Sequence, residues 1–252
     1  MRCSALDPTL LVSIVLLVIL SAGPAAAQDD SYTEEVRGVW ITNVDSDVLN
    51  SKAQIAEAMD FLHANGFNVV FPVVWNGGHT LFPSSTMLTL TGVPQDPFFA
   101  AQGRDPLYEL IIEAHRNGME VIPWFEYGFA ASFGQDGGAI LAAKPEWAAL
   151  DKDGNQVVKN GFYWMNGINP EVQDFLLSLV QEVIENYDVD GIQGDDRLPA
   201  MPVAGGYSAY TQELYRSEHN GRSPTTIAID PTWIQWRSDK LNSHLLANCR
   251  QG

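Results

Sequence analysis

The sequence predicts an α/β fold, a (β/α)₈ TIM barrel of which about four strand–helix units are present. Three observations predict this fold class. Strand-like and helix-like segments alternate four times, which requires right-handed crossovers and a parallel sheet. The segment FNVVFPVVW (67–75) is almost continuously apolar, as in a strand covered on both faces. The turn TNVDSDVLNS after the first strand lacks the glycines of a doubly wound nucleotide-binding sheet.

The first unit is predicted as a strand over 36–42 followed by a helix. VRGVWIT (36–42) has the β-branched and aromatic content of a strand. Ser51 and Gln54 have the spacing of a capping box, and the apolar residues that follow recur on one helical face until Gly66. The helix is therefore expected to begin after Ser51 and to end at Gly66.

The second unit is the strand over 67–75, a loop over 76–104 and a helix that Asp105 and Pro106 begin and Gly118 ends. The loop is expected because the segment is rich in Gly, Thr, Ser and Pro. The helix is expected to bury the apolar stripe that its residues form on one side.

The third and fourth units are separated by a long insertion. MEVIPWFEY (119–127) is predicted as the third strand, and 128–168 as an excursion of loop and short helix. Asn169 and Pro170 then begin a long helix, and VDGIQGDD (189–196) is the fourth strand and its end. A Gly-, Ser- and Pro-containing connection leads to a last helix over 231–249.

The first 27 residues have the layout of a secretory signal peptide, which leaves one barrel domain over 28–252. Arg2 precedes the apolar run LLVSIVLLVIL, and Ala25 and Ala27 are small residues placed before a cut. The run is about half of the roughly 20 residues that a membrane span needs. We therefore expect cleavage near Ala27, a secreted or periplasmic product and no stable membrane anchor.

The charge and the motifs exclude several classes of function. The formal net charge of −17 repels phosphate backbones and anionic lipid, so neither nucleic acid nor a membrane is an expected partner, whereas a neutral sugar is compatible with it. We find no metal-ligand spacing, no G-x-S-x-G and no phosphate-cradling loop. No cofactor and no metal are expected.

Polar and aromatic residues follow all four predicted strands, at the C-terminal face where the active site of a barrel lies. In chain order they are Asn43 and Asp45, then Trp75, Asn76 and His79, then Glu126 and Tyr127, and finally Asp195, Asp196 and Arg197.

Side-chain alternation in the third and fourth strands indicates which of these residues face inward. Trp124 and Glu126 share a face, and Asp195 shares one with a glutamine that suits a polar barrel mouth. We expect Asp195 to point inward, and Asp196 to lie at the turn and orient Arg197. Asp188 and Asp190 are expected to cap the end of the preceding helix.

Carboxylates on neighbouring strands beside Trp and Tyr suit glycoside hydrolysis, which needs one protonated and one ionised carboxyl group. The predicted catalytic residues are Glu126, Asp195 and Asp196. The predicted substrate-binding residues are Asn43, Trp75, His79, Trp124, Tyr127 and Arg197. Trp124 could equally be ordinary barrel packing. Two other classes stay open, a non-catalytic carbohydrate-binding protein and a metal-dependent hydrolase, the latter disfavoured because the histidines are few and poorly spaced.

Several ordered blocks between residue 36 and about 242 resemble the glycosyl-hydrolase-like family 10, exported bacterial (β/α)₈ barrels. They are VRGVWIT, GFNVVFPVVW, DPLYELIIEAHRNGMEVIPWFEYGF, NPEVQDFLLSLVQEVIENYDVDGIQGDDR and WIQWRSDKLN. The resemblance implies a hydrolase of bacterial envelope polysaccharide, with peptidoglycan glycan strands the substrate of some relatives. Asp195 and Asp196 match the family motif GIHFDDY, which here reads GIQGDDR, and Glu126 in WFEYGF matches a subset of relatives.

The family's barrels continue beyond WRSDKLN into a fifth strand, whereas this sequence ends at ANCRQG. Eight units take about 250 residues in the usual barrel. The sequence therefore predicts the N-terminal part of a barrel, read from a longer gene. Its open strand edges would favour self-association, and an inactive half-barrel fragment is the alternative to an enzyme.

Overall fold

The computed structural model describes residues 35–195 and 197–248. The predicted signal peptide and Asp196 lie outside the described residues. The described residues from Val36 onward form one compact unit, and the elements below belong to it.

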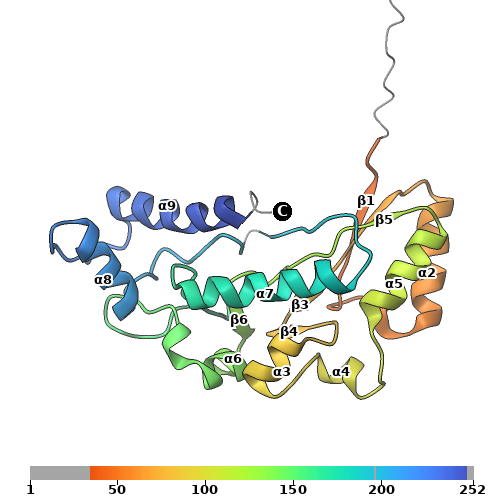
Figure 1. Ribbon diagram of the computed structural model, residues 1–252, viewed down its shortest axis with the longest axis horizontal. Helices are drawn as coiled ribbons and strands as arrows, with labels where there is room; N and C mark the ends of the chain where they lie inside the picture. Colours follow the sequence, from red (N-terminus) through yellow and green to blue (C-terminus); the bar gives the residue numbers. More distant parts are fainter. Residues whose placement is uncertain (1–34, 196, 249–252) are drawn as a thin grey trace, which may run out of the picture. The chain divides into compact units, whose positions relative to one another are not determined.

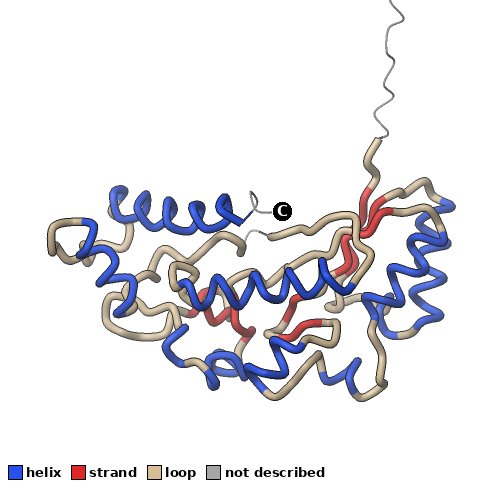
Figure 2. The backbone as a smooth tube through the Cα atoms, in the orientation of Figure 1, coloured by secondary structure: helices blue, strands red, loops and turns tan. Residues whose placement is uncertain are grey.

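The predicted units contain a parallel sheet with the strand order β1-β2-β5 (Figures 1 and 2). Its strands are β1 (Gly38–Ile41), β2 (Val69–Pro72) and β5 (Glu120–Val121). In register, Val39 pairs with Val70, and Val70 with Val121. Val70 and Val121 are fully buried, as strands covered on both faces of a parallel sheet require. The predicted parallel sheet is confirmed over these three strands.

The predicted fourth strand lies beside β5 but forms no regular strand. A parallel bridge joins Trp124 to Gln193, and Gln193 exchanges backbone hydrogen bonds with Pro123 and Phe125 at 2.9 and 2.8 Å. Gly191 and Gly194 interrupt this segment. Glycine weakens a strand because it has no side chain to pack, so the pairing is short.

Three long helices begin where the sequence predicts them. They are α2 (Lys52–Ala64), α5 (Pro106–Arg116) and α7 (Pro170–Asn186). Their N-cap side chains accept backbone hydrogen bonds, Ser51 from Gln54 at 3.2 Å, Asp105 at 3.1 Å and Asn169 at 3.0 Å. α2 and α5 lie side by side and contact each other (Figure 1). Capping was readable from sequence because its partners are local.

The segment 76–104 is not the loop that the sequence predicts. It contains the hairpin of β3 (Trp75–Asn76) and β4 (His79–Thr80), followed by the helices α3 (Ser85–Thr91) and α4 (Pro97–Ala100). Ser84 and Asp96 cap the two helices, each accepting a backbone hydrogen bond. These helices are too short for apolar periodicity to reveal them, so only the capping residues were a signal.

The insertion 128–168 contains an antiparallel sheet that the sequence analysis missed. Its strand order is β6-β8-β7, and its elements are β6 (Ala130–Phe133), the 3₁₀ helix η2 (Gln135–Gly137), α6 (Gly138–Ala143), η3 (Pro145–Trp147), β7 (Val158–Lys159) and β8 (Phe162–Trp164). Strands of two to four residues have too few positions to show alternation. The remaining helices are η1 (Val48–Asn50), α8 (Ala209–Glu218) and the predicted α9 (Pro231–Asn248).

Glu182 of α7 binds the N-terminus of α3. Its carboxylate accepts hydrogen bonds from the hydroxyls of Ser84 and Ser85, both at 2.5 Å, and from the backbone N–H and hydroxyl of Thr86 at 2.8 and 3.0 Å. Burial alone would raise the pKa of Glu182, but these hydrogen bonds outweigh it and hold the pKa below its usual 4.5. The carboxylate therefore stabilises the fold when it is ionised.

Glu182→Gln is expected to lower the free energy of unfolding by about 1–2 kcal/mol at pH 7, because hydrogen bonds to a charged and partly solvated acceptor are lost. A lowered folded-state pKa gives stability that is present above the unfolded pKa and is lost as the pH falls through the folded pKa. The difference in the free energy of unfolding between Glu182→Gln and the wild type should thus disappear as the pH falls below about 4.5. Urea titrations would measure it, with Glu185→Gln on the exposed side of α7 as the control. A difference that does not change with pH would contradict this role.

Candidate functional site

Residues from four strand ends meet in one hydrogen-bonded cluster. Glu126 Oε2 accepts from Asn76 Nδ2 at 2.7 Å, and Glu126 Oε1 accepts from Arg197 Nη2 at 3.2 Å. The same Nη2 donates to Asp195 Oδ2 at 3.1 Å. Asn76 Nδ2 also donates to Asn43 Oδ1 at 3.0 Å. We call these five residues the carboxylate cluster.

The parallel pairing explains why Glu126 and Asp195 come together. Trp124 bridges Gln193, and residues two positions further along each strand lie on the same face as these partners. Arg197 then joins the two carboxylates, because its Nε also donates to the backbone oxygen of Glu126 at 3.0 Å. A planar guanidinium with several donors fixes the orientation of the groups it binds.

The cluster is half-buried, so its charges interact strongly and can still reach a ligand. The exposed fractions of the side chains of Arg197, Glu126 and Asp195 are 17%, 19% and 23%. Asn76, which holds Glu126 from the other side, is buried. Partial removal from water strengthens the interactions among such groups relative to a fully exposed ion pair.

Gly128 allows the chain after Glu126 to fold against Arg197. Its φ is +47°, and a Cβ on it would lie 2.3 Å from the backbone oxygen of Arg197. Phe129 N donates to that same oxygen at 3.0 Å. Glycine is needed here both for the left-handed backbone and for the close approach.

Tyr127 and Phe162 stack around the guanidinium of Arg197. The guanidinium carbon lies 5.7 Å from the ring centroid of Tyr127 and 4.9 Å from that of Phe162. Tyr127 is buried, and burial raises the pKa of its hydroxyl. Phe162 belongs to the insertion and was missed by sequence reasoning, because no local pattern places it near residue 197.

Trp75 lies in the core and not at the substrate-binding rim where the sequence places it. The side chain is fully buried, its Nε1 donates to Gly128 O at 3.1 Å, and its ring packs edge-on against Phe175 of α7 at 5.9 Å. It has no exposed surface with which to contact a ligand. The reason is tertiary, since Phe175 is a hundred residues further along the chain.

The other predicted binding residues lie near the cluster in different settings. His79 pairs with Asn76 across the β3–β4 hairpin and is half-buried, and its Nδ1 has no hydrogen-bond partner among the described residues. Trp124 is half-buried and packs against the hydrophobic core. Asp196 is outside the described residues, so its predicted catalytic role stays a prediction.

Asp190 does not cap α7. Its Oδ2 accepts from the backbone N–H of Val121 at 2.8 Å and lies 3.1 Å from His115 Nε2. Asp190 therefore links the predicted fourth strand to β5. The side chain of Asp188 is 93% exposed. Of the three aspartates of DVDGIQGDDR that the structure describes, only Asp195 reaches the carboxylate cluster.

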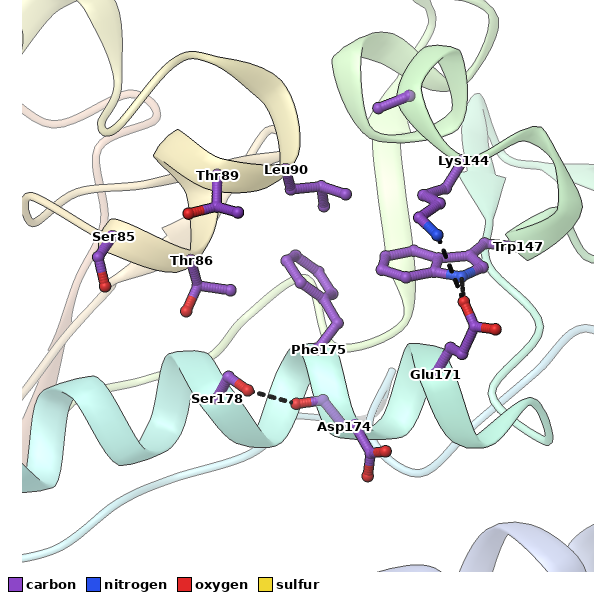
Figure 3. Close-up of a pocket in the computed structure, with 11 residues that line it drawn as sticks. Ser85, Thr86, Thr89, Leu90, Lys144, Trp147, Glu171, Asp174, Phe175 and Ser178 are labelled. Carbon is purple, nitrogen blue, oxygen red and sulfur yellow. Dashed lines mark hydrogen bonds and ion pairs between the residues drawn. The ribbon is translucent and has the colours of Figure 1, made fainter.

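A separate cleft of about 630 Å³ lies between α3, α6, η3 and α7 (Figure 3). Phe175 points from α7 between Leu90 and Trp147 (Figure 3). Glu171 already accepts from Trp147 Nε1 at 3.0 Å and lies 3.5 Å from Lys144 Nζ. None of the residues that line the cleft belongs to the carboxylate cluster, so the cleft is separate from the candidate active site.

The part of the chain that the structure describes, residues 35–195 and 197–248, lacks two features. No group of three or more His, Cys, Asp or Glu side chains there is placed to hold a metal ion. No helix there is long and apolar enough to cross a membrane.

Among proteins of known sequence, the chain is similar to two named glycosyl hydrolases. It is 28% identical over 229 residues to glycosyl hydrolase DigH of Escherichia coli strain K12, which covers 75% of this chain and 51% of the relative. It is 29% identical over 217 residues to glycosyl hydrolase YngK of Bacillus subtilis strain 168, with 77% and 39% covered. The chain thus spans about half or less of the length of these relatives.

Solved structures with a similar fold include glycosidases. A hypothetical protein from Ruminiclostridium thermocellum ATCC 27405 superposes with a TM-score of 0.58 at 14% identity, over 85% of this chain and 92% of that one. A β-N-acetylhexosaminidase gives a TM-score of 0.51 at 16% identity, over 83% and 45%. At these identities the likeness concerns the fold alone, which is of the TIM-barrel type. That the barrel is cut after four units stays a prediction.

The family model described as glycosyl hydrolase-like 10 matches residues 35–249, which include the whole carboxylate cluster. The resemblance that the sequence blocks indicate is thereby confirmed, and the chain belongs to the glycosyl hydrolase-like 10 family.

Proposed function

We propose that this chain carries the active site of an exported glycoside hydrolase that cleaves bacterial envelope polysaccharide, with peptidoglycan glycan strands as its substrate. The observation that carries the proposal is the pair Glu126 and Asp195, held by Arg197 at neighbouring strand ends. The glycosyl hydrolase-like family and the glycosidase-type fold support it. A net charge of −17 suits a neutral glycan better than a phosphate polymer.

The chemistry that this pair can perform is acid–base cleavage of a glycosidic bond. One carboxyl group donates a proton to the leaving oxygen, and the other acts on the anomeric carbon as nucleophile or through water as base. Asn76 and Arg197 hold Glu126 from two sides, which orients its carboxylate toward one position. No metal or cofactor is required. Asp196, next to Asp195 in the chain, is proposed as a further carboxylate of the site.

The spacing of the two carboxylates bears on the stereochemistry of cleavage. Glu126 Oε1 and Asp195 Oδ2 both lie within 3.2 Å of the same Arg197 nitrogen, so these oxygens are separated by less than twice that distance. Retaining glycosidases have carboxyl groups about 5–5.5 Å apart, whereas inverting enzymes need roughly 6.5–9.5 Å to admit a water. The bound applies to the two nearest oxygens and not to the centres of the carboxyl groups, so it fits both classes, and the configuration of the product decides between them.

Incubation with peptidoglycan glycan strands freed of peptide is expected to release new reducing ends. Mass spectrometry would identify the products, and NMR during the first turnovers would give their configuration. A chelator should leave the rate unchanged. Binding of the strands without new reducing ends would favour the non-catalytic carbohydrate-binding alternative, and loss of activity with the chelator would favour a metal-dependent hydrolase.

We also propose that the protein acts outside the cytoplasm, after removal of residues 1–27. A secreted or periplasmic position would bring the site to the envelope glycan. Self-association through open strand edges is the accompanying proposal for the chain as it stands.

A further inference from the structure

The antiparallel sheet of the insertion begins beside the carboxylate cluster. Only two residues separate Tyr127 from β6, and Tyr127 directly follows Glu126. Phe133 of β6 and Phe162 of β8 are partners in the sheet register, and their rings meet edge-to-face at 5.3 Å. The sheet therefore places two aromatic rings together next to the cluster.

One of these rings is joined to the cluster itself. The Phe162 ring lies 4.9 Å from the guanidinium carbon of Arg197 and 5.4 Å from the ring of Tyr127. Arg197 in turn contacts both carboxylates. A continuous series of contacts thus leads from Glu126 through Arg197 and Phe162 to Phe133.

The second ring is exposed and held in place. Phe133 is 60% exposed. Its ring lies over Gly161, since a Cβ at that position would be 2.6 Å from Phe133 Cε2. A single exposed aromatic residue is ordinary, but an exposed ring packed against a half-buried one beside a charged site forms a continuous apolar patch.

We propose that Phe133 and Phe162 form an aromatic subsite that binds a pyranose ring of the glycan next to the bond that is cleaved. This inference rests on the proposed function and names residues that extend its site. A pyranose presents an apolar face of C–H groups and a rim of hydroxyls. Aromatic surface next to a few fixed polar groups, here Arg197 and the carboxylates, is the lining that such a ligand requires.

Phe133→Ala tests the subsite without touching Arg197 or the carboxylates. The matched control is Phe61→Ala, because Phe61 of α2 is also exposed, at 64%. Both changes would be made in a Glu126→Gln background that stops turnover, and calorimetry would measure the affinity for a peptide-free glycan oligomer of at least four sugars. We expect Phe133→Ala to weaken binding about tenfold, Phe61→Ala to leave it within twofold, and Phe133→Tyr to retain it because the ring is kept.

The same variants in the wild-type background separate this proposal from the proposed function. Phe133→Ala should raise KM more than it lowers kcat, since the subsite holds substrate and takes no part in proton transfer. If the wild type cleaves the glycan but Phe133→Ala and Phe61→Ala bind the oligomer with equal affinity, the subsite is overturned and the proposed hydrolase stands. Glycan binding that depends on Phe133 without any cleavage would overturn the hydrolase and leave the subsite. Absence of glycan binding would overturn the subsite as well.

Discussion

Asp195→Asn and Glu126→Gln are each expected to lower kcat for glycan cleavage by about a hundredfold or more. Both substitutions keep the size of the side chain and an oxygen that can accept from Arg197, but they remove the carboxyl group that transfers a proton or attacks the sugar. Because the bonds to Arg197 are retained in part, the fold should survive. The loss should therefore appear in kcat and much less in the midpoint of thermal unfolding.

Asp188→Asn is the matched control for this pair. It removes an aspartate from the same short stretch of sequence, but the Asp188 side chain is 93% exposed and its Oδ2 lies 3.7 Å from His115 Nδ1, outside the carboxylate cluster. Its kcat should equal that of the wild type. Unchanged turnover in Asp195→Asn, with an intact circular dichroism spectrum, would remove Asp195 from the mechanism, and the same result for Glu126→Gln would remove Glu126.

Gly128→Ala is expected to destabilise the protein by about 3 kcal/mol or more and to abolish activity. Alanine at a positive φ costs about 1–2 kcal/mol. Its Cβ would also lie 2.3 and 2.4 Å from the backbone oxygen and carbon of Arg197, and backbone atoms cannot move aside as the end of a side chain can. Relief of this clash would displace Arg197 from both carboxylates.

Gly103→Ala separates the cost of the positive φ from the cost of the clash with the backbone of Arg197. Gly103 also has a positive φ, +62°, but a Cβ there would meet no atom within 4 Å. Gly103→Ala should therefore lower the free energy of unfolding by only about 1–2 kcal/mol, the cost of alanine at a positive φ, and leave kcat unchanged. Denaturant titration and activity of both variants measure the difference. Equal stability losses would show that the approach of Gly128 to Arg197 does not matter.

Elements whose signals are local could be predicted from the sequence. The capping side chains of Ser51, Asp105 and Asn169 bond to backbone N–H groups two or three residues away, so the chain needs no tertiary partner to reveal them. The apolar run 67–75 likewise identifies a covered strand by composition alone. The family followed from ordered blocks of such segments.

The candidate site could be predicted in part for the same reason. Alternation along two strands is a local property, and it placed Glu126 and Asp195 on faces that the structure brings to one arginine. The role of Asn76 in holding Glu126 was not assigned, although its position after Trp75 at a strand end was a usable signal. The strands of the insertion were missed, because segments of two to four residues carry no periodicity.

By itself, the sequence determined where the main helices begin, which segments can be covered strands and which acidic residues stand at strand ends. These follow from capping and side-chain periodicity, which act over a few residues. Only the tertiary structure decided that Trp75 is core and that Arg197 joins two carboxylates under the ring of Phe162. Such contacts join residues tens of positions apart, and their energies depend on which surfaces the folded chain removes from water.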